Sequence, residues 1–385
     1  MDFQLTEEQA MLKKMVHDFA DEKIAPLVGQ WDEKCESPDR VIISQYADMG
    51  LLGITLPQKY GGAGLTAFDA VLAMEELARV SPIAALPVFE ASVGPIRVVE
   101  LFGSEEQKER FLPPACKGEK FMSVAMTEPE AGSALTDLTT RAVLQGDHYV
   151  INGQKRFISG GGHSEAYMVY VRLSDKKGAK GIGGIVVEKG APGFSFGKQE
   201  VFMGLHGMPS CDLIFEDCIV PKENLVVPEG GFAFLMQAFD VERCGNATMS
   251  LGIAWGALEA AIKYSQERKA FGKQICEFQG VQFLLADMAM KVEAARLLIY
   301  RAAVNAGLGL PSIFESSVAK CFANEIGKEV TDMALQVFGG YGYSKEYPAE
   351  RMLRDSRGWP VAGGTVQMQR INIAGAMLHR RFNQR

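Results

Sequence analysis

The spacing of apolar residues changes twice along this chain of 385 residues, and the two changes limit the folds that it can adopt. Up to residue 120, apolar side chains recur at helical spacing. A capping-box pair, Thr6 and Gln9, precedes the first stripe. This stripe consists of Met11, Leu12, Met15, Val16 and Phe19. The first third of the chain is therefore predicted to be helical.

A period of two replaces the helical period from Phe121 onward. The segment HYVINGQKRFIS is predicted to form a hairpin around Asn152 and Gly153, because Asn-Gly is a strong signal for a two-residue turn. Further short β segments follow, with Gly and Pro between them. This part of the chain is predicted to form a small antiparallel barrel or sandwich.

Longer helical segments return after residue 229, over residues 231–270, 278–306, 316–338 and 365–382. Long helices joined by short links favour an antiparallel bundle. The expected domains are therefore an N-terminal all-α domain over 1–120, an antiparallel β-barrel over 121–228 and a C-terminal four-helix bundle over 229–385.

The composition excludes several classes of protein. A net charge of −7 and a pI near 5.5 argue against a nucleic-acid partner, which would require a basic face. No run of about 18 apolar residues predicts a membrane span, and the acidic start MDFQLTEEQA is not a leader, so a cytoplasmic chain is expected. The seven cysteines are scattered without a CxxC pair, which predicts neither a disulfide framework nor a metal site.

Four short motifs are compatible with a bound ligand, although each has an ordinary structural interpretation. AMTEPEAGS, from Ala125 to Ser133, is either a turn or a strand end that binds a polar heterocycle. KRFISGGG is a hairpin end or a close approach to a flat ligand. RKAFGK places a cation and an aromatic ring at a helix end, and the glycine pair 339–340 is a helix cap or a diphosphate site.

Taken in order, TEPEAGS, INGQKRFIS, ERKAFGK, LQVFGGYGYSKEYPAERMLRD and GGTVQMQR resemble the motifs of the acyl-CoA dehydrogenase flavoprotein family over essentially the whole chain. The resemblance implies an acyl-CoA dehydrogenase-like fold, usually in a homotetramer, with FAD between the β and C-terminal domains. It implies oxidation of an acyl-CoA thioester to its trans-2-enoyl form. A base removes the Cα proton, the Cβ hydride passes to flavin N5, and electrons go to an electron-transfer flavoprotein.

The resemblance also assigns roles by matched position. The flavin ring and ribityl chain are expected to contact Met126, Thr127, Phe157 and Ser159. A neighbouring subunit is expected to bind the adenine dinucleotide part through Arg268, Phe271, Gln279, Gln336 and Gly340. Thr365 and Gln367 are expected to add to the flavin site, and Ser133, Asp240 and Arg243 to contact the CoA moiety. The chain departs from the usual TEPGAGSD run at Glu130 and Ala134.

The family's usual base is absent. Its Tyr-Glu-Gly-Thr run is replaced by Ala362, Gly363, Gly364 and Thr365. A second branch, which includes isovaleryl-CoA dehydrogenase, carries its glutamate one residue before an arginine on the long helix, and this matches Glu242. The helical neighbours of Glu242 include no cation, and these apolar surroundings favour a raised pKa.

Three of the neighbouring residues complete this interpretation. Arg243 points away from Glu242 and is expected to pair with Asp240, three residues earlier. Gly363 is expected to donate its amide to the thioester carbonyl, as that residue does in the family, and its missing side chain suits a branched, alicyclic or otherwise bulky acyl group.

Glu90 is a second candidate acid, at a position that lies near the bottom of the acyl pocket in relatives. It is a helix-face glutamate, a contact for a polar acyl end, or a second acid/base on a cyclohexane- or cyclohexene-carboxyl-CoA ring. The alternatives to a dehydrogenase are a family member that does not oxidise, such as an enoyl-CoA reductase or a desulfinase, an oxidase, and an inactive CoA-binding scaffold.

Overall fold

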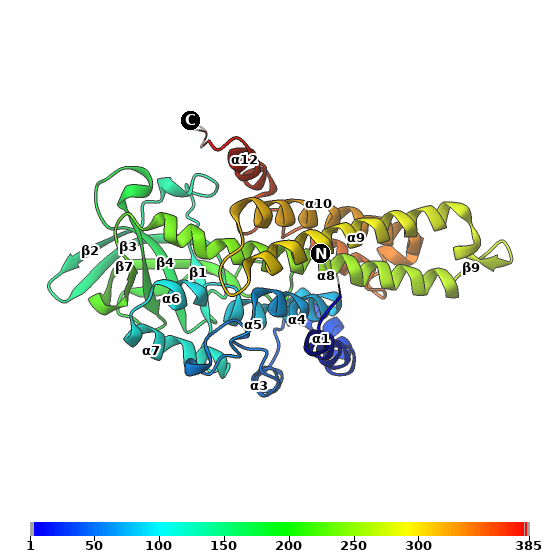
Figure 1. Cartoon of the computed structure of the whole chain (residues 1–385), viewed down its shortest axis with the longest axis horizontal. Coiled ribbons are helices and arrows are strands. Elements are labelled where there is room, and N and C mark those ends of the chain that lie inside the picture. Colours follow the sequence, from blue (N-terminus) through cyan, green and yellow to red (C-terminus); the bar gives the residue numbers. More distant parts are fainter. Residues whose placement is uncertain (1–3, 381, 383–385) are drawn as a thin grey trace.

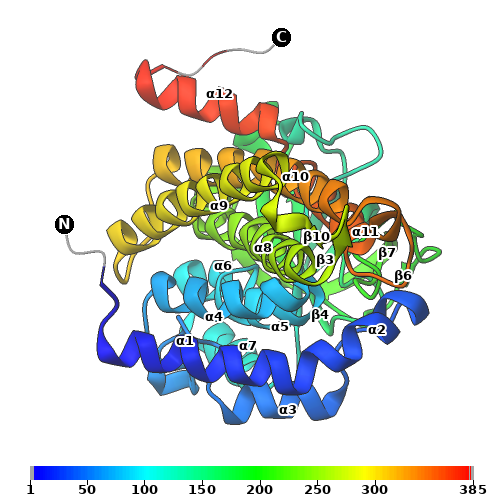
Figure 2. The same ribbon diagram turned by 90° about the vertical axis from the view of Figure 1, so that its right-hand side faces the viewer.

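A computed structural model of the chain describes residues 4–380 and residue 382. Its first part is helical: α1 (Glu7–Phe19), α2 (Val28–Lys34), α3 (Arg40–Asp48), α4 (Ala67–Val80), α5 (Pro82–Ser92), α6 (Ile96–Phe102) and α7 (Glu105–Cys116). The capping box of Thr6 and Gln9 is confirmed at the start of α1. Helices α4 and α5 are almost entirely buried, and α4 lies against the long helix α8 (Phe232–Glu267) (Figures 1 and 2).

The middle part is one eight-stranded sheet with the order β6-β7-β3-β2-β4-β5-β8 and with β1 paired to β4. Its strands are β1 (Met122–Ala125), β2 (Arg141–Gln145), β3 (His148–Ser159), β4 (Ala166–Arg172), β5 (Ile182–Glu188), β6 (Phe194–Phe196), β7 (Ser210–Pro221) and β8 (Leu225–Val227). Most pairs are antiparallel, but β1–β4 and β2–β4 are parallel.

The hairpin predicted around Asn152 and Gly153 is wrong. The turn lies earlier, at residues 146 and 147, because Gln145 of β2 pairs with His148 of β3. Asn152 and Gly153 instead lie inside β3, where the register against β7 shifts between Ile151 and Gly153. A glycine within a strand marks such a bulge as readily as a turn, and only the pairing partner distinguishes the two.

The last part is dominated by three long helices, α8, α9 (Gln279–Ala306) and α10 (Ile313–Phe338), followed by α11 (Ala349–Ser356) and α12 (Val366–Met377). The predicted order of helical, β and helical parts is thus confirmed. The fourth predicted helix is shorter than expected, since α12 ends at Met377 rather than at residue 382. A short hairpin, β9 (Lys269–Ala270) and β10 (Lys273–Gln274), lies at the end of the molecule opposite the β-sheet (Figure 1).

One stretch, Pro82–Phe102, is long and apolar enough to cross a membrane by length and composition, but 83% of its window is buried inside the protein. It includes α5 and α6, and it packs beside α8. Burial within the core accounts for its apolar composition.

Candidate active site

Glu242 lies in the third turn of α8 with its carboxyl half-buried. Burial raises the pKa of this carboxyl to about 8, the carboxylate of Glu90 raises it further, and the ammonium of Lys320 opposes the rise. The buried hydroxyl of Tyr170, which has no hydrogen-bond partner among the described residues, interacts electrostatically with Glu242. A carboxyl group with this pKa can accept and return a proton near neutral pH.

The loop between α11 and α12 carries the residues that replace the family's usual acid. Gly363 adopts the left-handed backbone conformation, with φ +61°. A Cβ built on it would lie 3.1 Å from Lys320 Nζ, 3.4 Å from Phe239 Cζ and 3.5 Å from Asn246 Nδ2. The Gly363 N–H meets no acceptor among the described residues, so this backbone donor is free for a ligand.

Lys320 of α10 is fully buried, and no motif in the sequence indicated that it lies at this site. Its Nζ donates to the carbonyl oxygen of Ala362 at 2.8 Å and to that of Gly363. Burial lowers the pKa of Lys320 to about 7, Arg243 adds to the lowering, and Glu242 opposes it. The helical neighbours of Glu242 include no cation, as predicted, and the cation that acts on it, Lys320, comes from another helix.

Glu90 lies near the end of α5 and is also half-buried. Burial raises the pKa of its carboxyl to about 8, the charge of Glu165 adds to the rise, and a hydrogen bond with Ser123 opposes it. Ser123 Oγ lies 2.7 Å from Ser164 Oγ. The charge of Glu90 raises the pKa of Glu242, so carboxyl groups of two different domains interact at this site.

Arg243 forms the predicted ion pair with Asp240, and both side chains are buried. The guanidinium also lies over the ring of Phe239, 5.6 Å from its centroid. Burial lowers the pKa of Arg243 to about 10. The contact of this pair with the CoA moiety stays a prediction, as does that of Ser133, which lies exposed in the turn after β1.

The four predicted contacts of the flavin ring lie on two neighbouring strand ends. Met126 and Thr127 follow β1, and Phe157 and Ser159 end β3. The Arg156 N–H donates to the Thr127 carbonyl at 2.8 Å, which holds the two ends together. Phe157 adopts φ +58° and leaves half of its surface exposed. An aromatic ring held open in this way can pack against a flat ligand.

A buried ion pair that the sequence analysis missed supports these strand ends. Lys155 Nζ lies 2.9 Å from Glu128 Oε1 and donates to the Met126 carbonyl at 3.2 Å. The Glu128 carboxylate also accepts from the N–H groups of Thr139 and Thr140, at 2.6 and 2.9 Å. Despite burial, Lys155 and these donors lower the pKa of Glu128 to about 2. The only sequence signal was an acid in the turn and a lysine in a strand.

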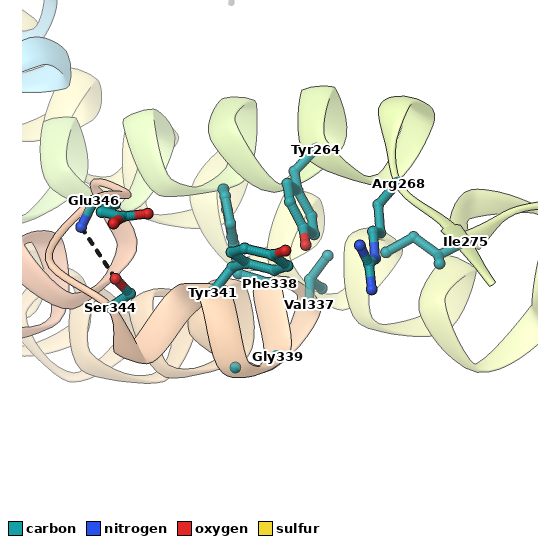
Figure 3. A pocket seen from close by; sticks show the side chains of 10 residues that line it. Tyr264, Arg268, Ile275, Val337, Phe338, Gly339, Tyr341, Ser344 and Glu346 are labelled. Carbon is teal, nitrogen blue, oxygen red and sulfur yellow. Dashed lines mark hydrogen bonds between the residues drawn. The ribbon is translucent and has the colours of Figure 1, made fainter.

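The predicted contacts of the adenine dinucleotide lie far from these strand ends. Arg268 and Gly340 line an open pocket of about 620 Å³ (Figure 3), with the Arg268 guanidinium 5.3 Å from the Tyr341 ring centroid. Phe271 is 97% exposed at the tip of the β9–β10 hairpin. Gln279 begins α9 and Gln336 lies in the last turn of α10, both exposed. This hairpin and the sheet lie at opposite ends of the molecule, so one chain does not bring the two groups together (Figure 1).

The remaining predicted residues lie beside the Gly363 loop. Thr365 caps α12, its hydroxyl accepting the Met368 N–H at 3.3 Å, and Gln367 is exposed in the first turn of that helix. No group of three metal-ligating side chains occurs within residues 4–380. All seven cysteines are unpaired.

Three family descriptions match consecutive parts of the chain: "Acyl-CoA dehydrogenase, N-terminal domain" over residues 6–119, "middle domain" over 123–218 and "C-terminal domain" over 229–378. The chain therefore belongs to the acyl-CoA dehydrogenase family. It is an oxidoreductase that acts on a CH–CH bond of an acyl-CoA thioester and depends on FAD.

Known proteins are similar over nearly the whole chain. A short-chain-specific acyl-CoA dehydrogenase of Clostridium acetobutylicum is 40% identical, over 97% of this chain and 99% of that protein. The caffeyl-CoA reductase–Etf complex subunit CarC of Acetobacterium woodii is 41% identical, over 97% and 99%. The structure of butyryl-CoA dehydrogenase from Megasphaera elsdenii superposes with a TM-score of 0.94, at 39% identity, over 98% of this chain and 100% of the other.

The described residues fit FAD. At the β-sheet end of the molecule, the half-exposed ring of Phe157 offers a flat surface and the Ser159 hydroxyl offers a polar contact. At the other end, Arg268 and Gly340 line the open pocket in Figure 3, and a Cβ built on Gly340 would meet nothing within 4 Å.

Proposed function

We propose that this chain dehydrogenates an acyl-CoA between Cα and Cβ, with Glu242 as the base that removes the Cα proton. The observation that carries the proposal is the half-buried carboxyl of Glu242, whose pKa of about 8 lies close to neutral pH, in the same site as the free Gly363 N–H. A carboxylate in water is far too weak a base for a thioester α-proton. A desolvated carboxylate together with a donor to the developing enolate oxygen makes the transfer feasible.

Each residue of the site has a separate role in the proposed reaction. Gly363 donates its N–H to the thioester carbonyl and stabilises the negative charge that develops there. Glu242 takes the proton, and its partly apolar surroundings lower the cost of the neutral acid that results. Bound FAD supplies the acceptor for the hydride that leaves Cβ. Phe157 and Ser159 hold the flavin end of the cofactor, and Asp240 and Arg243 contact the CoA moiety.

Assembly and electron transfer belong to the same proposal. The β-sheet and the β9–β10 hairpin lie at opposite ends of the molecule (Figure 1), which supports the proposed homotetramer, in which neighbouring subunits share each FAD. An electron-transfer flavoprotein is the proposed electron acceptor, supported by the relative named as a subunit of a reductase–Etf complex. The seven unpaired cysteines support a cytoplasmic location.

The acyl group is proposed to be branched, alicyclic or otherwise bulky. Ala362 and Gly363 stand where the family's usual run has tyrosine and glutamate, so this loop carries less side-chain volume than that run. Lys320, Phe239 and Asn246 lie on the side toward which a Gly363 side chain would point. A relative named for caffeyl-CoA, whose acyl group carries an aromatic ring, supports a wide substrate.

A second candidate is a dehydrogenase of cyclohexane- or cyclohexene-carboxyl-CoA in which Glu90 is a second acid/base. The observation that favours it is the pKa of about 8 at Glu90, close to Glu242. An enoyl-CoA reductase uses the same groups in the reverse direction. A desulfinase is disfavoured, because expulsion of sulfite does not require the base at Glu242.

An anaerobic flavin-bleaching screen tests the proposal and separates the candidates. The holoenzyme is mixed with straight, branched, alicyclic and dicarboxylic acyl-CoAs, and the loss of flavin absorbance is followed. Fastest bleaching by a branched or alicyclic acyl-CoA is expected. Bleaching by none of the saturated acyl-CoAs, with reoxidation of reduced flavin by an enoyl-CoA, would identify a reductase instead. Bleaching by straight-chain substrates alone would contradict the proposed acyl group.

A further inference from the structure

Lys320 is the one fully buried cation that contacts the Gly363 loop within the described residues, and neither the motifs nor the proposed chemistry assigns it a role. It lies at the end of the second turn of α10, one turn before Asn324, which donates to Asn246 of α8. A buried ammonium is costly unless it is paired or fully hydrogen-bonded. We therefore expect a buried ammonium at the site of Glu242 to have a function.

The loop is held by its carbonyl groups. Lys320 binds the carbonyl oxygens of Ala362 and Gly363, Asn324 donates to that of Trp359 at 2.9 Å, and Gln369 donates to that of Gly364 at 2.9 Å. Asn324 is fixed in turn by the Ser250 hydroxyl at 2.7 Å. Side chains of α8, α10 and α12 thus hold the carbonyl side of the loop.

The geometry of the peptide bond means that the held carbonyl groups also fix the direction of the N–H groups in this loop. No peptide bond in the described chain is cis. In a trans peptide unit the N–H points opposite to the C=O. Because Lys320 holds the carbonyl of Ala362, the N–H of Gly363 points away from Lys320, and the same argument applies to the N–H of Gly364. The unpartnered Gly363 N–H is thus aimed by the hydrogen bond on the other side of its own peptide unit.

Lys320 also belongs to the electrostatic environment of Glu242. The titratable groups that act on Glu242 are Glu90 from α5 and Lys320 from α10, and Tyr170 from β4 interacts with it electrostatically. Of these, Lys320 favours the carboxylate, while Arg243, the next residue on α8, pairs with Asp240.

Other charged side chains on helices packed against α8 pair elsewhere. Glu75 of α4 binds Arg296 of α9, Arg79 of α4 binds Glu259, and Arg97 of α6 binds Glu100. Asp355 of α11 accepts the Leu205 N–H. None of them competes with Lys320 at Glu242.

We propose that Lys320 is a positioning residue of the reaction: its hydrogen bonds to the carbonyl oxygens of Ala362 and Gly363 aim the Gly363 N–H at the thioester carbonyl, and its charge adds to the electrostatic environment of Glu242. This inference rests on the proposed function, in which Glu242 is the base. Lys320 itself does not touch the reacting atoms. It acts through the Gly363 N–H on the thioester carbonyl, where negative charge develops. Its own charge acts on Glu242, which accepts the proton.

The pH dependence of flavin bleaching tests the effect of the Lys320 charge on Glu242. The rate should rise with pH as Glu242 loses its proton, Lys320 lowers the pKa of that carboxyl, and a nearby opposite charge shifts a carboxyl pKa by about 1 unit or more. Lys320→Gln, which keeps one donor and loses the charge, should move the profile upward by about 1 pH unit and slow bleaching about tenfold below the wild-type midpoint. Lys320→Met should do the same. Lys328→Met, on the exposed part of α10, is the control and should leave the profile unchanged.

Infrared spectroscopy of a bound acyl-CoA with a 13C-labelled thioester carbonyl tests the aiming role. Glu242→Gln prevents turnover, and the carbonyl frequency is compared between Glu242→Gln and Glu242→Gln/Lys320→Met. The double variant should show a smaller lowering of the frequency on binding, because the Gly363 donor is no longer held.

The outcomes separate the two proposals. A profile of Lys320→Gln that superimposes on the wild type, or a carbonyl frequency that is insensitive to Lys320→Met, overturns the role of Lys320, even if either variant is less stable. Wild-type protein that no acyl-CoA bleaches, or Glu242→Gln that bleaches normally, overturns the proposed function instead. FAD content and melting temperature of each variant show whether the folded holoenzyme was compared.

Discussion

The substitution Gly363→Ala tests the close approach between the loop and Lys320. Any side chain at this position adopts the left-handed conformation at φ +61°, which costs about 1–2 kcal/mol for a residue other than glycine. The new Cβ also lies 3.1 Å from Lys320 Nζ, where the ammonium is fixed by two carbonyl groups and cannot move away freely. Overpacking of this kind costs about 1–3 kcal/mol. The free energy of unfolding should therefore fall by about 2–5 kcal/mol.

Gly50 provides the matched control. It has φ +70° just after α3, and a Cβ built on it would meet nothing within 4 Å. Gly50→Ala should thus show only the backbone cost of about 1–2 kcal/mol. Urea-induced unfolding of both variants gives the comparison, with unchanged slopes required. A loss at Gly363 no larger than that at Gly50 would refute the packing of Lys320 against the loop.

Gly363 is also the position at which the proposed width of the acyl group can be tested. Gly363→Glu restores the acid of the family's usual run and fills room between Lys320 and Phe239. Bleaching by branched or alicyclic acyl-CoAs should fall at least about tenfold relative to bleaching by straight-chain acyl-CoAs, since misplacement of a substrate lowers the rate steeply. An unchanged ratio of the two rates would contradict the assignment of this space to the acyl group.

Three further predictions concern other parts of the site. Glu128→Gln leaves Lys155 buried without its partner and should lower the free energy of unfolding in urea by about 3–5 kcal/mol. The double variant Glu128→Gln/Lys155→Met should restore part of this loss. If the effects of the two substitutions were simply additive, the coupling between the two side chains would be excluded. Because the pKa of Glu128 is lowered to about 2 in the folded chain, its contribution should be present at neutral pH and be lost as the pH falls through about 2. Glu90→Gln removes a carboxylate that raises the pKa of Glu242, so the pH profile of bleaching by a branched acyl-CoA should move downward, whereas complete inactivity would assign Glu90 to the chemistry. Dilution that dissociates the assembly, measured by light scattering, should release FAD in parallel, and a monomer that retains FAD would contradict a site shared between subunits.

Local patterns predicted the elements of the fold but not their partners. The change of apolar period located the helical and β regions, because side-chain spacing depends only on neighbouring residues. The hairpin was misplaced because both Gly146–Asp147 and Asn152–Gly153 are acceptable turn pairs, and strand pairing made the choice. The early end of α12 was likewise not visible in its composition.

In the candidate site, too, contacts within one helix could be predicted from the sequence, whereas contacts between elements could not. The ion pair of Arg243 with Asp240 followed from helical spacing and is confirmed, because both residues lie on one helix. Lys320 is 78 residues from Glu242 in the sequence, and Lys155 is 27 residues from Glu128, so no local spacing relates either pair. Contacts between helices and between strand ends depend on tertiary packing, which a single sequence does not display.

The central claim, that the base has moved to α8, is tested most directly by the rate of anaerobic flavin bleaching in Glu242→Gln. The variant should bind FAD and acyl-CoA nearly as well as the wild type, since the amide has the same shape as the acid. Its bleaching rate should fall by about 10²–10⁴-fold, the usual contribution of a general base. Retention of more than about a few per cent of the wild-type rate would contradict the account and place the base elsewhere, with Glu90 the next candidate.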